Sequence, residues 1–516
     1  MRIFDTYVQK LKYKVLTELA RQTWVGNDAF SVFNDIANQV VKKGEPTMSC
    51  CIYKDRAIVA ERIRIALGGK KEDHNVIQVI DIACDECPVA GHVVTDLCRG
   101  CVAHACVDAC KLGAITVDSH QKAEIDKSKC VECGKCAKSC PYSAIANFKR
   151  PCERACKVDA ISMAPDGVAQ IDSEKCIECG ACVYKCPFGA TLDVSSITDI
   201  IKTIVDSDNN KNYHVHAIVA PAIAGQFQYA KAGQLISAIR ELGFYAVEEV
   251  ALGADIVAYK EAQELQEKGF LTSSCCPAFV KYIKMKFPQL AEHISHNLSP
   301  MAETGKLIKE QDPDAKIVFI GPCTAKKGEV RKPEVHQYVD YVMTFEELQA
   351  MIDSKDIAVD QLPETELDTA TYYGRVFART GGLSEAVTEA VREQKAAAEA
   401  AKADAPDGAG ASGAVASGEA GTNLGKPASG DGACDGDSAD SKPFVFDPIV
   451  CDGIDSCKTA LLRASKGLLP NNFIEGMVCT DGCIGGAACL SHGNADKRAI
   501  DNYGKKASHK EIRDVL

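Results

Sequence analysis

The second half of the chain alternates between two kinds of hydrophobic pattern. Short continuous apolar runs, such as "HAIVAP" (216–221) and "KIVFIGP" (316–322), predict strands. Between them lie stretches whose apolar residues recur at helical spacing, such as "AGQLISAIRELGF" (232–244) and "FEELQAMID" (345–353). This alternation predicts an α/β domain with largely parallel strands.

The stretch from residue 76 to residue 200 follows a different pattern, which is set by cysteines. Of the 27 cysteines in the chain, 16 lie between Cys84 and Cys186. A first run is spaced C-x2-C-x4-C-x3-C, and a second reads C-x2-C-x2-C-x3-C-P, a spacing that a third run repeats. The runs are Cys98, Cys101, Cys106 and Cys110; Cys130, Cys133, Cys136 and Cys140; and Cys176, Cys179, Cys182 and Cys186.

Such runs are typical of 4Fe-4S clusters in ferredoxin-like domains. Three closely spaced thiolates on a tight loop can hold three corners of a cubane, and the fourth cysteine reaches the neighbouring cluster. With the pairs "CDEC" and "CERAC", the block has enough thiols for four clusters. The predicted sets are Cys98, Cys101, Cys106 with Cys140; Cys130, Cys133, Cys136 with Cys110; Cys176, Cys179, Cys182 with Cys156; and Cys84, Cys87, Cys152 with Cys186. A structural zinc site or buried free thiols are the alternatives, above all for the Cys84/Cys87 pair.

Composition narrows the possible functions. At 516 residues with 46% hydrophobic and 25% charged content, the chain can form two or three packed domains. Its net charge of -12 argues against a protein that binds nucleic acid or an anionic membrane surface. No apolar run is long enough to span a membrane, and the amino-terminal stretch has no signal-like apolar region. We therefore expect a cytoplasmic protein, whose cysteines bind metal rather than form disulfides.

These patterns divide the chain into four parts. Residues 1–75 carry no predicted role, residues 76–200 form the iron-sulfur domain, and residues 210–391 and 443–516 form the α/β domain. Residues 392–442 are rich in Ala, Gly, Ser and Asp and predict a disordered insert. Cys50, Cys51 and Cys434 have no assigned function, and Cys451, Cys457 and Cys489 are predicted to be buried.

Three segments of the α/β domain place cysteines beside Pro or Gly, where the backbone can turn sharply and approach a bulky cofactor. They read "TSSCCPAF" (272–279), "GPCTAKKGE" (321–329) and "EGMVCTDGCIGGAAC" (475–489). Their thiols Cys276, Cys323, Cys479 and Cys483 could hold one further cluster. In order and separation the segments resemble the three signature motifs of the FeFe-hydrogenases, in the branch that carries ferredoxin-like domains. The resemblance covers about residues 45–516 apart from the insert.

This resemblance implies the H-cluster, a cubane joined through a cysteine sulfur to a two-iron centre with CO, CN and dithiolate ligands. The four cysteines would bind the cubane, and Cys483 would supply the bridging sulfur. Cys275 matches the family's proton-relay thiol, a task that suits a group with an unperturbed pKa of about 8.5. Lys326 matches the lysine that donates to a cyanide, and Met477 the methionine that packs on the two-iron centre. The alternatives are a small buried Cys275, an exposed Lys326 and a Met477 that belongs to the plain core.

The resemblance also implies a path for protons from Cys275 through Glu261, Ser295 and Glu264 to solvent. Glu261 and Glu264 are three positions apart on a predicted helix and so share one face, although such faces are often merely solvated. Glu329 lies just beyond Lys326. The chain departs from relatives at Gly321, at Ala222 and in the ending "CIGGAACL", and these departures leave the ligand set intact.

The implied function is the reversible reduction of two protons by two electrons to H2. Ferredoxin would supply the electrons through two to four accessory 4Fe-4S clusters, and maturation proteins would deliver the two-iron centre. The sequence has no glycine-rich nucleotide fingerprint, and its histidines, including His104, His214 and His216, show no metal-ligand spacing. A redox-sensing relative or a non-catalytic iron-sulfur protein is the alternative, although Cys275 and Lys326 argue against the latter.

Overall fold

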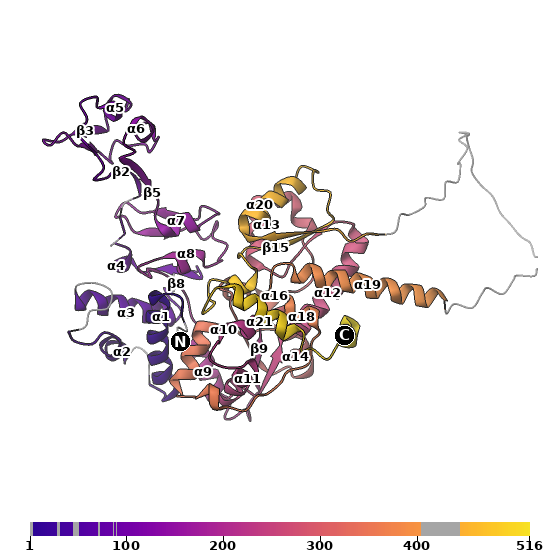
Figure 1. Cartoon of the computed structure of the whole chain (residues 1–516). Helices are drawn as coiled ribbons and strands as arrows, with labels where there is room; N and C mark the ends of the chain where they lie inside the picture. The colour runs from indigo at the N-terminus through magenta and orange to yellow at the C-terminus, as the bar shows by residue number, and fades with distance from the viewer. Residues whose placement is uncertain are drawn as a thin grey trace, which may run out of the picture.

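The computed structural model describes residues 4–27, 31–44, 51–70, 73–85, 87–88, 90–403 and 444–516. The cysteine-rich part forms a column beside the α/β domain, and its outermost portion projects away from the rest of the molecule (Figure 1). The predicted positions Cys50 and Cys434 lie outside the described residues, as do residues 404–442 of the predicted insert.

The amino-terminal segment folds into helices that pack on the α/β domain. They are α1 (Tyr7–Trp24), α2 (Phe33–Val40) and α3 (Ile52–Ala66). A capping box at Thr6 and Gln9 starts α1, which satisfies otherwise unpaired backbone N–H groups. Leu19 lies in one hydrophobic core with Ile197 and Phe345 of later elements. The segment without a predicted role is therefore part of the main core.

The outer ferredoxin-like module is a continuous piece of chain. Its outer strands β2 and β5 pair antiparallel, with Gly91 opposite Phe148, and its hairpin strands β3 and β4 pair with Ile115 opposite Ile125. The elements are β2 (Gly91–Val94), α5 (Ala105–Asp108), β3 (Ile115–Val117), β4 (Ala123–Ile125), α6 (Lys135–Ser139) and β5 (Ile145–Phe148).

The inner ferredoxin-like module is split in sequence, because the whole outer module is inserted into it. Strand β1 pairs antiparallel with β8, with Ile77 opposite Asp193, so residues on both sides of the insertion build one small fold. The elements are β1 (Ile77–Val79), α4 (Asp81–Cys84), α7 (Pro151–Ala155), β6 (Ile161–Met163), β7 (Ala169–Ile171), α8 (Ala181–Lys185) and β8 (Thr191–Asp193). The pairs Cys84/Cys87 and Cys152/Cys156 are thus the two halves of one interrupted cysteine run.

Arg150 stabilises the point where the chain passes back from the outer module into the inner module. Its side chain is only 2% exposed, and its guanidinium donates to the carbonyl oxygens of Pro88 (3.0 Å), Cys87 (3.1 Å) and Gly167 (2.7 Å). Because a buried guanidinium needs partners for its N–H groups, these bonds hold the two crossings of the chain together.

The α/β domain contains two parallel sheets. One has the strand order β10-β9-β12-β13 and the other the order β11-β15-β14, and all of these pairings are parallel. The strands are β9 (Val215–Val219), β10 (Ala246–Glu249), β11 (Leu271–Thr272), β12 (Lys316–Gly321), β13 (Tyr341–Thr344), β14 (Pro448–Asp452) and β15 (Phe473–Met477). The predicted α/β class with parallel strands is confirmed.

Helices cover these sheets and connect their strands, as parallel pairing requires. They are α9 (Ile197–Asp206), α10 (Ile223–Gln226), α11 (Ala232–Glu241), α12 (Val250–Lys268), α13 (Pro277–Lys286), α14 (Pro300–Gln311), α15 (Ala325–Glu329), α16 (Pro333–His336), α17 (Phe345–Ser354), α18 (Tyr372–Val376), α19 (Gly382–Ala403), α20 (Gly453–Ala464) and α21 (Asn494–Gly504). Short 3-10 turns lie at Pro288–His293, Val359–Gln361, Cys483–Gly485 and Ile512–Asp514. Within the described ranges, none of the helices is both long and apolar enough to cross a bilayer.

The predicted start of the disordered insert is wrong. Helix α19 continues through residues 392–403, and the buried carboxylate of Glu393 accepts hydrogen bonds from the backbone N–H groups of Ile512 (2.6 Å) and Arg513 (2.9 Å). The Ala-rich composition of this stretch is that of a good helix former, and the carboxyl-terminal contact anchors it.

Candidate functional site

The three cysteine motifs all follow directly on parallel strands. Cys276 comes after β11 and immediately precedes α13, Cys323 comes after β12, and Cys479 comes after β15. The carboxyl ends of parallel strands in open α/β sheets are where ligands are bound. The fold therefore brings segments far apart in sequence to one place.

The thiols of Cys276, Cys323, Cys479 and Cys483 form one group. Burial raises the pKa of Cys483 to about 12, and the nearby thiols of Cys323 and Cys276 raise it further. The same neighbours act on Cys479, whose pKa burial also raises. Four mutually close thiols away from bulk water are the donor set that a 4Fe-4S cubane uses. The residues present thus fit that cofactor.

Gly482 makes the turn between the last two of these cysteines possible. Its φ is +78°, and a Cβ there would lie 2.7 Å from the backbone nitrogen of Thr380. Another residue would therefore be strained and would push the loop outward.

Cys275 lies in a hydrophobic cluster with Met477, whereas Cys276 packs at the edge of this cluster and of a second one that contains Phe279. Cys275 is 8% exposed and Met477 is 2% exposed. Burial raises the pKa of Cys275 well above its ordinary value, with further contributions from Glu261 and from Cys276. The two adjacent thiols therefore face different surroundings.

Lys326 is buried beside Cys275. Its ammonium donates to the carbonyl oxygen of Cys275 (3.3 Å) and forms an ion pair with Glu329 (2.6 Å). Burial opposes the charge, but Glu329 outweighs it, so the pKa of Lys326 is raised. The alternative of an exposed lysine is wrong.

Glu261, beside Cys275, and the hydrogen-bonded pair of Ser295 and Glu264 lie near one another. Burial raises the pKa of Glu261 to about 7, against the lowering effects of the Ser274 backbone N–H, which donates to Oε1 (3.3 Å), and of the Ser295 side chain. The Ser295 hydroxyl donates to Glu264 (3.1 Å), whose side chain is 11% exposed and receives a hydrogen bond from Lys268 (2.7 Å). Among the described residues, Oε2 of Glu261 has no hydrogen-bond partner. These groups lie between the buried thiol of Cys275 and the partly exposed side chain of Lys268.

The outer module brings its two predicted cysteine sets together as the spacing predicts. Cys98, Cys101, Cys106 and Cys140 line one cavity, and Cys110, Cys130, Cys133 and Cys136 line another. Cys140, the fourth cysteine of the second run, thus joins the first set, and Cys110, the fourth cysteine of the first run, joins the second set. A two-cluster ferredoxin exchanges its fourth ligands in this way.

The inner module shows the same exchange. Burial raises the pKa of Cys152 to about 11, and the thiols of Cys186 and Cys84 raise it further; Cys84 and Cys186 likewise act on Cys87 after burial. The thiols of Cys179, Cys176 and Cys156 surround Cys182, whose pKa burial raises. All four predicted sets are therefore assembled in space.

The inner module touches the cysteine motifs of the α/β domain directly. Burial raises the pKa of Cys179 to about 12, and Cys276 is among the thiols that add to this shift. The Thr324 hydroxyl donates to the carbonyl oxygen of Glu178 (2.7 Å), and a Cβ on Gly180 would lie 2.6 Å from the Thr324 hydroxyl oxygen. This close contact leaves little space between the third cysteine set and the motif thiols.

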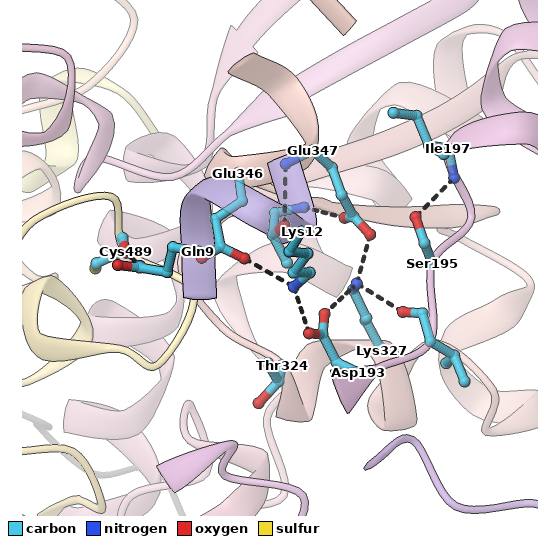
Figure 2. Close-up of polar contacts among 12 residues, drawn as sticks. Gln9, Lys12, Asp193, Ser195, Ile197, Thr324, Lys327, Glu346, Glu347 and Cys489 are labelled. Carbon is cyan, nitrogen blue, oxygen red and sulfur yellow. Dashed lines mark hydrogen bonds and ion pairs between the residues drawn. The ribbon is translucent and has the colours of Figure 1, made fainter. Parts of the chain in front are cut away.

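A buried ion network joins this interface to the amino-terminal helix, and neither its members nor its existence was predicted from the sequence. Figure 2 shows Lys12 and Lys327 both pointing at Asp193. Lys12 also pairs with Glu346 (2.7 Å), and Lys327 pairs with Glu347 (2.7 Å). Each of these five side chains is less than a tenth exposed. The sequence gives little indication that these five residues form a buried network, because single charged residues on amphipathic elements are usually exposed to solvent.

The departure at Gly321 has a structural explanation. A Cβ at this position would lie 2.6 Å from the ring of Phe319, so that aromatic side chain fills the space beside the glycine. Ala222 is fully buried. Cys451, Cys457 and Cys489 are also fully buried, as predicted.

Comparison with known proteins places these motifs in a family. Residues 213–487, more than half of the chain, match "Iron only hydrogenase large subunit, C-terminal domain", and residues 97–144 and 150–190 match "4Fe-4S dicluster domain". Iron hydrogenase 1 of Clostridium pasteurianum is 30% identical over 308 residues, which are 54% of this chain and 52% of that protein. The periplasmic [Fe] hydrogenase large subunit of Nitratidesulfovibrio vulgaris is 29% identical over 278 residues, which are 49% of this chain and 61% of that protein.

Other matches cover less or are weaker. The chain spans about half to three fifths of the length of these two curated relatives. The cytosolic Fe-S cluster assembly factor NAR1 of Kluyveromyces lactis is 37% identical over 95 residues, which are 18% of this chain and 20% of that protein. A solved apo [FeFe]-hydrogenase of Chlamydomonas reinhardtii matches 62% of this chain and 94% of its own length at 20% identity, with a TM-score of 0.45. On the sequence matches, the chain belongs to the iron-only hydrogenase large-subunit family and carries 4Fe-4S dicluster modules ahead of its hydrogenase domain.

Proposed function

We propose that this protein is an FeFe-hydrogenase that interconverts two protons and two electrons with H2. The observation that carries the proposal is the placement of Cys275, which is buried between the motif thiols and the carboxylate of Glu261. A cluster-carrying protein without turnover would not need a buried thiol that continues into a polar chain. Cys276, Cys323, Cys479 and Cys483 are the proposed ligands of the H-cluster cubane, which with its two-iron centre would supply the site where H2 is made or split.

Protons would travel along the chain of side chains that ends at Cys275. The thiol exchanges a proton with Glu261, whose raised pKa keeps its carboxyl close to half protonated near neutrality. Ser295 passes the proton on, because a hydroxyl can donate and accept at the same time. Glu264 delivers it to the surface beside Lys268. Lys326 holds the backbone of Cys275 in place through its hydrogen bond to the carbonyl oxygen.

Electrons would travel through the four accessory cysteine sets toward the motif thiols. Cys133 in the outer module is exposed, so this module offers the point nearest to an external carrier. The last step is the short one from the set containing Cys179 to the set containing Cys276. We propose the sixteen cysteines of the modules as cluster ligands, in the four sets that the fold assembles.

The proposed electron partner is a ferredoxin. Lys111 and Lys135 line the same cavity as the exposed Cys133, so an acidic one-electron carrier suits this surface. Maturation proteins would insert the two-iron centre. We propose the cytoplasm as the compartment, because thiols stay reduced there; the relative from Nitratidesulfovibrio vulgaris is described as periplasmic.

The matches to NAR1 favour a second candidate, a non-catalytic iron-sulfur protein on the same scaffold. Infrared spectroscopy of the anaerobically purified protein, matured beside a known hydrogenase, tests both. We expect bands where metal-bound CO and CN absorb, together with H2 formation from a reduced viologen dye. If the control shows these bands and this protein does not, the second candidate is correct.

Replacing Glu261 with Gln should remove a pH dependence of stability as well as proton transfer. Burial raises the pKa of Glu261 from its ordinary 4.5 to about 7, so the folded protein binds a proton that the unfolded chain releases. Stability therefore falls as the pH rises through that interval, by roughly 1–3 kcal/mol. As the pH rises from about 5 to about 8, the thermal unfolding midpoint of Glu261→Gln should fall less steeply than the midpoint of the wild type.

Glu264→Gln is the matched control, since it lies one helical turn away in the same chain of groups. This variant keeps the carboxyl at position 261 and the burial that dominates its pKa, and loses only the smaller raising effect of Glu264, so it should keep most of the wild-type dependence of the midpoint on pH. Equal slopes for Glu261→Gln and wild type would show that the Glu261 carboxyl is already ionised near neutrality.

A further inference from the structure

Two histidines and an aspartate meet at the edge of the main sheet that lies away from the cysteine motifs. His214 directly precedes β9 and His216 lies within it, so both side chains are on one face of the strand. Asp312 ends helix α14, shortly before the paired strand β12 begins. Because the cysteine motifs follow the carboxyl ends of the strands, this cluster lies at the opposite, amino-terminal end.

The polar atoms of the three side chains face one another. One nitrogen or oxygen from each lies within 4.8 Å of the other two. Asp312 Oδ2 is 2.7 Å from Nδ1 of His214 and 3.9 Å from Nε2 of His216. The side chain of His216 is 9% exposed, whereas those of His214 and Asp312 are 39% and 30% exposed. His216 is thus the buried member of the cluster, and solvent can reach the cluster from the side of His214 and Asp312.

His216 is held as a metal ligand would be held. Its Nδ1 lies 2.8 Å from a carboxylate oxygen of Glu248 on β10, which favours the tautomer with the proton on Nδ1. Nε2 then carries a lone pair and points toward Asp312, and among the described residues it has no hydrogen-bond partner. A carboxylate that orients a histidine through one nitrogen, leaving the other nitrogen free, is the usual support behind a metal-bound imidazole.

The second histidine is also fixed in orientation. The ring of Tyr245 stacks on His214 with centroids 3.8 Å apart and an angle of 16° between the planes. The 3.9 Å between His216 and Asp312 is too long for a hydrogen bond, so an ion pair between them does not satisfy the buried nitrogen. A cation placed between the three groups would satisfy it.

We propose that His214, His216 and Asp312 bind a divalent zinc ion, with Glu248 as the residue that positions His216. Two imidazole nitrogens and a carboxylate oxygen, with water in a fourth place, form a common zinc environment. The ion would tie the start of β9 to the end of α14 and so stabilise this edge of the domain. The site is independent of the proposed hydrogenase function, because it lies away from the cysteine motifs and needs none of their chemistry.

The experiment uses the iron-loaded protein with one added equivalent of zinc. X-ray absorption at the zinc edge distinguishes this metal from iron and distinguishes its ligands. We expect one tightly bound zinc per chain with nitrogen or oxygen neighbours at about 2.0–2.1 Å. Neighbours at about 2.3 Å would be sulfur, which would mean that zinc occupies cysteine thiols and that the proposal is wrong.

Variants locate the ion and separate the roles of the residues. His216→Gln and Asp312→Asn should lower zinc affinity by a factor of roughly 100 or more, and Glu248→Gln by roughly 10–100. His336→Gln is the control, because His336 is exposed on α16 and should leave affinity unchanged. His214→Gln alters a partly exposed side chain and gives a second test if His216→Gln lowers the iron content. Zinc that dialyses away from the wild type, or binds equally to all variants, would overturn the proposal.

Discussion

Replacing Cys275 with Ala is expected to lower the rate of H2 formation by a factor on the order of 10²–10⁴, the usual contribution of a positioned proton donor. The thiol is the link between Glu261 and the motif cysteines, and alanine offers no proton at that position. The proposed ligand thiol Cys276 stays in place, so the iron content and the infrared bands of CO and CN should be those of the wild type. H2 formation from a reduced dye, normalised to the intensity of those bands, measures the effect.

Cys451→Ala is the matched control for this substitution. Cys451 is another fully buried thiol in the same domain, and it lies on β14 rather than in the proposed proton path. The control therefore loses a similar side chain and should keep most of its activity. If Cys275→Ala retains more than about a tenth of the normalised rate, general acid–base catalysis by this thiol is excluded.

Lys12→Met is expected to loosen the amino-terminal helix from the rest of the protein by roughly 3–5 kcal/mol. In the wild type, the two lysines of the buried network face three carboxylates, and Lys12 contacts both Asp193 and Glu346 (Figure 2). Methionine keeps most of the length of the side chain but leaves these carboxylates short of a positive charge. Hydrogen exchange of the α1 amides should therefore accelerate by a factor on the order of 10²–10³.

Two further variants test whether charge is the cause. Lys10→Met changes an exposed lysine on the same helix and should leave the exchange unaffected. Adding Glu346→Gln to Lys12→Met restores the original balance of charge and should recover much of the protection. A double variant as unprotected as Lys12→Met would show that shape, and not charge, holds the helix.

The network should stay ionised at neutral pH. Burial opposes the charge of Asp193, but Lys12 and Lys327 outweigh it and hold the pKa of that carboxyl well below its ordinary value. The stability that a depressed carboxyl pKa contributes is present above the unfolded pKa and is lost only as the pH falls through the folded one. Protection of α1 in the wild type should therefore not depend on pH across the neutral range.

Local patterns predicted the parts of the site that depend on neighbouring residues. The spacing within each cysteine run predicted which three thiols share a loop, because a cluster loop is short and its geometry is encoded by adjacent positions. The motifs around Cys276, Cys323 and Cys479 marked the ends of strands, and the fold joins them there. The start of the insert was misplaced because its first residues continue helix α19, in which Glu393 contacts the distant carboxyl-terminal segment.

The sequence by itself determined the α/β class and the hydrogenase family, since hydrophobic period and motif spacing are local properties. Only the tertiary structure decided which distant residues share a site. The insertion of one ferredoxin-like module into another follows from the pairing of β1 with β8, across a long stretch of intervening chain. The contact of Lys12 with Asp193 and the proximity of His216 to Asp312 likewise depend on long-range packing. Such contacts cannot be predicted from the spacing of neighbouring residues. A charge or an unpaired nitrogen has a large energetic effect only when the fold removes it from water.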